Sequence, residues 1–207
     1  QNQTRCRVVT SSVPVTVCID DVAPETSLVD VPPALTSERI LISWQGTDAF
    51  PPDGQPFFET FIQGLDGEWS GPQTGTQVGF DDLGPGDYTF QVRAVDLAGN
   101  VDSSPATASF KVVTFKRGYA SNDDLYNMTD AISILNWLFL GTAKPRCLKA
   151  ADANDDGKVD ITDGVRLLNH LFLGGPAPPP PFAACGLDPT EDDLDCQEFP
   201  LCPAARP

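Results

Sequence analysis

DANDDGKVDITD, at residues 152–163, has the spacing of a calcium-binding loop. Oxygen-bearing side chains occupy its positions 1, 3, 5, 9 and 12, and Gly157 occupies position 6, where the chain must turn sharply. A Ca²⁺ ion takes about six to eight oxygen ligands, and a loop with this spacing supplies them. The predicted ligands are the side chains of Asp152, Asn154, Asp156, Asp160 and Asp163 and the carbonyl group of Lys158.

An acidic, solvent-exposed turn is the alternative interpretation, because such turns are also rich in aspartate. The glycine and the helical pattern that follows the loop both match the EF-hand signature, which favours calcium. Ca²⁺ is the only cofactor that the sequence predicts.

An altered copy of this pattern lies 33 residues earlier, so that Asp130 corresponds to Asp163. In both copies apolar residues follow at helical spacing and a glycine ends the segment, which predicts two helices. We expect each helix to bury its apolar face against the other. The expected faces are Ile132, Leu135, Leu138 and Phe139 in the first copy and Val165, Leu168, Leu171 and Phe172 in the second.

Two such loop-helix units in tandem, without a preceding helix, resemble the dockerin family of bacterial extracellular proteins. The resemblance covers residues 117–175 and implies calcium binding and docking onto a cohesin-like partner. Dockerins recognise partners chiefly through the residues just before the last ligand, which are Met128-Thr129 and Ile161-Thr162 here.

The first copy departs from the dockerin pattern at two positions. Tyr119 stands where the second copy has Asp152, and Asp124 stands where it has Gly157. Because a carboxylate ligand is lost, we expect this degenerate site to be weaker or empty. Its remaining predicted ligands are Ser121, Asp123, Asn127, Asp130 and the carbonyl group of Leu125.

The segment before the repeats has the alternating pattern of β-strands. Apolar residues alternate with mostly polar ones at 40–44 and 88–94, and turn residues separate the runs, which predicts a sandwich. Trp44 is the expected core residue facing the strand of Tyr88. The run LGPGDYTFQVRAVD, residues 83–96, resembles fibronectin type III and related immunoglobulin-like domains, which implies that Tyr88 fixes the corner of the fold.

The predicted fold class is therefore multidomain and mainly β, with an immunoglobulin/fibronectin III-like β-sandwich and a small α-helical dockerin-like domain. Four segments are expected: a disulfide hairpin or donor strand at 1–22, the sandwich at 23–114, the calcium-binding domain at 115–175 and a proline-rich tail at 176–207. The run Pro176–Pro181 is either a spacer or a stiff strut packed across the helices.

Six cysteines without a CxxC spacing predict disulfides rather than a zinc site, and hence a secreted or cell-surface protein. Strand-like residues on both sides of Ser11-Ser12 place Cys6 opposite Cys18. The other predicted bridges are Cys147–Cys185 and Cys196–Cys202.

Composition and motifs argue against several function classes. The net charge is −16, which makes nucleic acid an unsuitable partner, and no apolar run approaches the roughly 20 residues of a membrane helix. The chain has one histidine, His170, and none of the common catalytic motifs, so we predict that it is not an enzyme, although paired carboxylates leave glycoside hydrolysis open.

Two weaker sites have ordinary alternatives. Asp48, Asp96 and Asn100 are either a cation site at a loop end or caps of their own turns, and capping is the commoner role. Trp69 and Phe57 or Phe58 are either sugar-stacking residues or strand packing, and packing is preferred.

Two functional hypotheses follow, of which the first is preferred. It is a non-catalytic, calcium-stabilised structural protein that assembles into an extracellular filament or surface fibre, with the N-terminal hairpin adding strands to another copy. The second is a docking module for a cohesin-like partner. An accessory part of a larger polysaccharide-degrading hydrolase is a further possibility.

Overall fold

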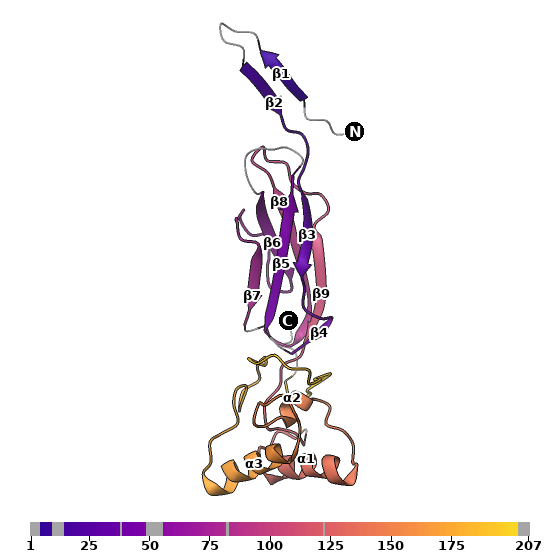
Figure 1. Ribbon diagram of the computed structural model, residues 1–207, viewed down its shortest axis with the longest axis vertical. Helices are drawn as coiled ribbons and strands as arrows, with labels where there is room; N and C mark the ends of the chain where they lie inside the picture. The colour runs from indigo at the N-terminus through magenta and orange to yellow at the C-terminus, as the bar shows by residue number, and fades with distance from the viewer. Residues whose placement is uncertain are drawn as a thin grey trace. The chain divides into compact units, whose positions relative to one another are not determined.

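The computed structural model describes residues 5–9, 15–37, 39–48, 56–81, 83–121 and 123–202, with only the backbone at 5–9 and 15–19. The chain divides into two compact units (Figure 1). Unit 1 lies within residues 1–31, 41–78 and 88–109, and unit 2 lies within residues 32–40, 79–87 and 110–207. This division differs from the predicted segments, because unit 2 takes in short pieces of the sandwich and the proline-rich tail.

The N-terminal hairpin consists of β1 (Arg5–Val9) and β2 (Val15–Ile19), which pair in antiparallel orientation. Cys6 lies directly opposite Cys18 in this register, as predicted. The predicted Cys6–Cys18 bond involves side chains outside the described part of the chain.

Within the described residues, seven further strands form the two sheets of the sandwich, which confirms the mainly β fold class. One sheet has the order β3-β5-β7 and the other the order β4-β9-β8-β6, in which β4 runs parallel to β9. The strands are β3 (Glu25–Asp30), β4 (Leu35–Thr36), β5 (Ile40–Thr47), β6 (Phe57–Gln63), β7 (Gln77–Phe80), β8 (Gly86–Val95) and β9 (Ala106–Val112).

Trp44 joins the two sheets within unit 1, as predicted. Its side chain is 2% exposed, and its ring centroid lies 6.1 Å from that of Phe58 on β6 and 5.7 Å from that of Phe90 on β8. Large aromatic side chains dominate the energy of such a core, and this packing needs no cysteine. Tyr88 is only half buried, and its role at the corner stays a prediction.

Unit 2 contains the helices α1 (Met128–Leu140), α2 (Leu148–Ala151) and α3 (Ile161–Leu173). The two long helices match the repeat: each begins with a capping box, at Asn127 and Asp160, and each ends at a left-handed glycine, Gly141 or Gly174. They pack against each other, as predicted, and lie side by side in Figure 1.

The predicted packing faces are correct in part. Leu138 and Leu168 pack against the helix core and Leu135 lies at Gly164, whereas the other predicted residues are exposed or lie at the margin. Ala131 and Ile134 of α1 and Gly164 and Leu167 of α3 are buried. The glycine at 164 allows close approach of the helices. A Cβ atom at Gly164 would lie 3.1 Å from the Leu135 side chain. The exposed residues of the predicted faces are Ile132, Phe139, Val165 and Phe172.

The tail packs as part of unit 2. Pro178 and Pro181 are buried, and the ring centroid of Phe182 lies 5.0 Å from that of Tyr126. Phe199 joins the core cluster of Phe115 and Tyr119. The proline-rich run is therefore a packed strut and not a free spacer.

The predicted bridges Cys147–Cys185 and Cys196–Cys202 are wrong. Cys147 is bonded to Cys196, and Cys185 is bonded to Cys202. The tail returns antiparallel to residues 146–148, with Leu148 N–H donating to the Asp195 carbonyl, and this return aligns Cys147 with Cys196. A turn at the end of the tail follows, in which the N–H of Cys202 donates to the carbonyl of Phe199.

Candidate metal site and exposed helix surface

The loop at 152–163 is closed by its first and last aspartates. Asp152 accepts the N–H groups of Asp155, Asp156 and Gly157 at 2.9–3.2 Å. Asp163 accepts the N–H groups of Ala153, Asn154 and Asp160 at 2.8–3.2 Å. The loop backbone is thereby folded around two carboxylates, as a cation-binding loop requires.

Asp152 and Asp163 are fully buried, and no described residue forms an ion pair with either carboxylate. Burial raises the pKa of Asp163 to about 7, and the neighbouring charge of Asp152 adds to that rise. Burial also raises the pKa of Asp152, against the hydrogen bonds from the loop and the charge of Arg117. Adjacent buried carboxylates that form no ion pair of their own are costly, so the donor set fits a hard cation.

The other predicted ligands lie nearer to the surface of the loop. Asn154 Nδ2 donates to Asp156 Oδ2 at 2.8 Å, and Asp156 Oδ1 accepts the N–H of Lys158. Asp160 caps α3 by accepting the N–H of Thr162 at 2.7 Å, and the Thr162 hydrogen bonds lower its pKa. The structure thus gathers Asp152 with Asp163 and Asn154 with Asp156, whereas Asp160 acts as a cap.

The degenerate loop closes with its own hydroxyl group. Asp130 Oδ1 accepts the N–H and Oγ–H of Ser121 at 3.0 and 2.7 Å, and its Oδ2 accepts the N–H of Asn127. Asp123 accepts the N–H of Leu125, so it serves its own turn. Tyr119, in the position of Asp152, stacks on Tyr126 at 5.5 Å between centroids. In the first loop the Ser121 hydroxyl therefore stands at the position of the predicted ligand Asn154, and the Tyr119 ring stands at the position of the charged Asp152.

A buried charge network lies beside the second loop, and sequence reasoning missed it. Arg117 is fully buried, and its Nη2 lies 2.8 Å from Asp155 Oδ1 and 2.6 Å from Asp188 Oδ1. Lys149 Nζ lies 3.1 Å from Asp188 Oδ2. The only signal in the sequence was an acidic run in the tail, because its cationic partners lie about 40 to 70 residues away.

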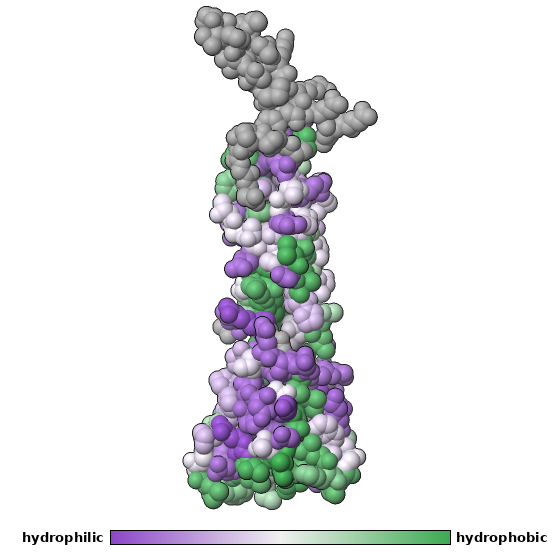
Figure 2. Space-filling view, in the orientation of Figure 1, coloured by the Kyte–Doolittle hydropathy of each residue, from purple (hydrophilic) through white to green (hydrophobic). Residues whose placement is uncertain are grey.

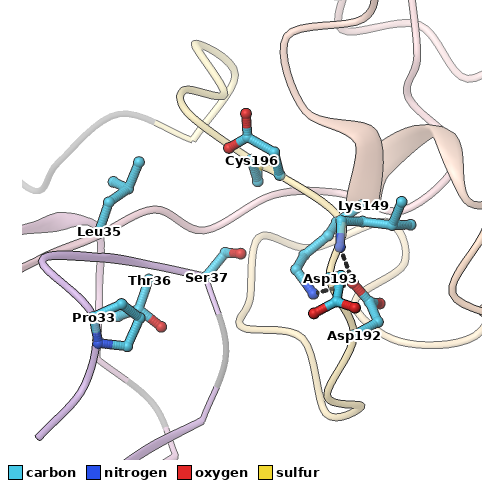
Figure 3. A pocket seen from close by; sticks show the side chains of 10 residues that line it. Pro33, Leu35, Thr36, Ser37, Lys149, Asp192, Asp193 and Cys196 are labelled. Atoms are coloured by element: carbon cyan, nitrogen blue, oxygen red, sulfur yellow. Dashed lines mark hydrogen bonds and ion pairs between the residues drawn. The ribbon is translucent and has the colours of Figure 1, made fainter.

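Lys149 also lines a pocket of about 260 Å³ within unit 2 (Figure 3). Its Nζ donates to Asp192 Oδ1 at 2.7 Å, and Figure 3 shows this contact between them. Asp152, Asp155 and Asp192 each bring a carboxylate oxygen within 4.8 Å of the others. Two of these three are already paired with Arg117 and Lys149, so the protein supplies its own cations there.

Asp20, Asp48 and Asp96 form a second acidic cluster, in unit 1. Asp96 accepts the backbone and side-chain N–H groups of Asn100 at 2.8 Å, which is the capping role. Asn100 Nδ2 is also within 3.1 Å of the Asp20 carbonyl. The capping interpretation thus accounts for Asp96 and Asn100.

The aromatic residues considered for sugar binding pack within unit 1. Phe58 is fully buried, and Trp69 lies between Phe61, at 5.7 Å, and the Arg93 guanidinium, at 4.2 Å from the ring centroid. His170 contacts Tyr126 and Phe182, and its Nδ1 is 2.9 Å from the Gly175 carbonyl. Phe58 and Trp69 thus pack within the sandwich, as the preferred interpretation expected, and His170 makes a contact near the end of α3.

The outer surface of α1 and α3 is strongly apolar, and Figure 2 shows it as green surface at the lower end of the view. The exposed fractions reach 65% for Phe139, 74% for Leu140, 65% for Phe172 and 80% for Leu173. We call this the α1–α3 surface, and it comprises Met128, Ile132, Phe139, Leu140, Ile161, Val165, Phe172 and Leu173. Its members are paired by the repeat, so each residue on α1 has a counterpart on α3.

Among the described residues, no helix has the length and apolar character needed to span a bilayer.

Comparisons with known proteins concern the sandwich. The family described as the Y_Y_Y domain matches residues 52–113, which contain β6 to β9. No curated protein matches the chain significantly.

Solved structures similar to this chain have low TM-scores. The fibronectin type III domain of human fibronectin type III domain containing protein 3 has 15% identity and a TM-score of 0.35, over 45% of this chain and 90% of that one. A Corynebacterium diphtheriae protein assigned as membrane anchored has 16% identity and a TM-score of 0.35, over 52% and 25%.

The extracellular domain assigned to a one-component system of B. thetaiotaomicron has 15% identity and a TM-score of 0.31, over 37% of this chain. The match spans only 10% of that chain.

Proposed function

We propose that this chain is a non-catalytic, extracellular, calcium-binding module that docks a separate protein on the α1–α3 surface. The observation that carries this proposal is the exposure of eight apolar side chains on two packed helices. Large apolar side chains exposed together on one pair of helices are typical of protein interaction sites. The disulfides Cys147–Cys196 and Cys185–Cys202 support an oxidising compartment.

The partner we propose is a different protein and not a second copy. The chain carries a net charge of −16, so two copies repel each other on close approach. A partner with an apolar contact surface and a neutral or basic rim would bury the exposed apolar side chains and would not be repelled by the acidic chain. Met128 and Ile161, just before the last predicted ligands, are exposed and so are accessible to the cohesin-like partner that the dockerin resemblance implies.

Calcium would act on this surface indirectly. The residues that would hold the ion are Asp152, Asn154, Asp156, Lys158, Asp160 and Asp163, while the first loop closes without one. When bound, Ca²⁺ supplies the positive charge that Asp152 and Asp163 lack in their buried positions. Asp160 and Asp163 also form the capping box of α3, so fixing them fixes the start of this helix.

The test is binding of the full chain to a purified cohesin-type domain, measured by isothermal titration calorimetry. We expect binding in calcium, loss of binding in EGTA, and at least a hundredfold loss for Phe139→Asp/Phe172→Asp. Leu97→Asp is the matched control, because Leu97 is 70% exposed in unit 1 and should leave affinity unchanged. Binding that survives the double substitution would refute the docking surface, and no binding by any cohesin-type domain would refute that partner class.

Filament assembly through the N-terminal hairpin is the second candidate, although it must overcome the charge repulsion between copies. Strands β1 and β2 pair only with each other among the described strands, and an isolated two-stranded sheet is marginally stable in water. Addition to another chain's sheet edge would stabilise it. Deleting residues 1–22 should abolish fibres in negative-stain images, and fibres that persist would exclude the hairpin as donor.

A further inference from the structure

We propose that Arg117 and the tail, residues 176–202, hold the loop at 152–163 in its metal-binding conformation before the ion arrives. Arg117 is then a positioning residue for calcium, although it is not a ligand. This inference rests on the calcium binding proposed above.

The Arg117 side chain donates four hydrogen bonds within unit 2 and forms ion pairs with two aspartates. Nη1 donates to the carbonyls of Lys149 and Asp152 at 3.3 and 2.9 Å, at the end of α2. Nη2 binds Asp155 and Asp188, and Nε donates to the Pro180 carbonyl at 3.1 Å. One rigid, planar group therefore connects the end of α2, the loop, the proline strut and the acidic tail.

Asp155 is the point at which this network acts on the loop. It has a φ of 63°, in the left-handed region that residues other than glycine seldom occupy. Its Oδ1 is held by Arg117 and by the Thr190 hydroxyl, which donates at 2.6 Å. Because Asp155 precedes Asp156 and Gly157, its conformation directs their N–H groups at Asp152.

The tail side of the network is fixed in turn. Asp188 is fully buried between Arg117 and Lys149, and its N–H donates to the Ser37 carbonyl at 2.7 Å. The disulfides at Cys185 and Cys196 anchor the segment on both sides of it. Groups that orient a metal site from behind its ligands commonly change metal affinity by about 10- to 100-fold when removed.

The calcium affinities of Arg117→Met and Arg117→Lys, measured in the full chain, distinguish a positioning role of Arg117 from an effect of its charge alone. If Arg117 acted only by its charge, Met would tighten calcium binding and Lys would leave it unchanged. Positioning predicts at least tenfold weaker binding for both, at unchanged stoichiometry, by isothermal titration calorimetry. Arg146→Lys is the matched control, because Arg146 forms an exposed ion pair with Glu198 of the tail away from the loop.

Amide hydrogen exchange in EGTA tests the positioning without calcium. We expect Asp155, Asp156 and Gly157 N–H groups to be protected in the native chain and to exchange at least tenfold faster in Arg117→Lys. Native affinity or native protection in that variant would overturn the inference. A native chain that binds no calcium, yet shows this loss of protection, would refute the metal site and leave the positioning role standing.

Discussion

Asp163 has opposite consequences for stability with and without calcium. Its carboxylate is buried, caps α3 and lies near Asp152, and its pKa of about 7 far exceeds the value near 3.9 of an unfolded aspartate. The folded, metal-free protein therefore binds a proton more tightly than the unfolded chain. That stabilisation is present in full below about pH 4 and is lost as pH rises through 7.

We expect the metal-free protein to become less stable as the pH is raised from 5 to 8. Burial raises the pKa of Asp152 and Asp130 as well, so these groups act with the same sign. In saturating calcium the trend should reverse, because the ligands must be deprotonated to bind the ion. Thermal unfolding in EGTA and in calcium measures both slopes, and a flat profile in EGTA would contradict this assignment.

Gly46 allows β5 to approach the Phe58 ring in unit 1. A Cβ atom there would lie 2.8 Å from both Phe58 and Pro56, although the backbone conformation suits any residue. We expect Gly46→Ala to cost about 1–3 kcal/mol in the free energy of unfolding, because the core is overpacked. In Gly75→Ala, the control, the added Cβ meets nothing within 4 Å. Chemical denaturation measures both variants, and equal stabilities would show that the ring shifts freely.

At the scale of elements, the two loop-helix units have the same backbone pattern but different chemistry. Both have capping boxes and glycine ends, and in both the last aspartate accepts N–H groups from the start of the loop. The Ser121 hydroxyl donates to the last aspartate of the first loop, whereas the second loop has two buried aspartates, Asp152 and Asp163. We therefore expect the second loop, and not the first, to bind a cation.

Calcium titration should accordingly give one ion per chain. Asp163→Asn should abolish binding, because it removes a buried carboxylate of the second loop. Asp130→Asn, the same change at the matching position of the first loop, should leave stoichiometry and affinity unchanged. Two ions per native chain, or a loss of binding in Asp130→Asn, would show that the degenerate site is filled.

At the scale of the whole molecule, the two compact units should respond differently to calcium. Unit 1 is held by apolar packing around Trp44, and it contains none of the predicted calcium ligands. In unit 2 the tail shares a core with Phe115 and Tyr119, so loss of the ion should destabilise residues 110–202 together and not the helices alone.

Calorimetry should resolve two transitions, of which only one moves to lower temperature in EGTA. Because an ion that binds only the folded state stabilises it, the shift should grow with calcium concentration. Asp163→Asn is the control and should show the shifted transition even in calcium. A single transition that EGTA leaves unchanged would contradict both the division into units and the metal site.

Local patterns determined much of this protein from its sequence. Alternating residues such as Ile42 and Trp44 identified buried strands, and the repeat identified two helices with their glycine ends. The register of Cys6 and Cys18 followed from a short hairpin. These features depend on interactions between residues that are near one another in the chain. A single stretch of sequence is therefore enough to predict each of them.

The tertiary structure alone decided which helix face is buried, how the later cysteines pair, and where Arg117 lies. Apolar periodicity placed Leu135 and Leu168 in the helix contact, but it could not show that Leu135 packs closely on Gly164 or that Ile132 and Val165 stay exposed. Cys147 meets Cys196 because the tail returns across 49 residues. A buried arginine is tolerated only where distant segments together supply its acceptors, and no local pattern records that meeting.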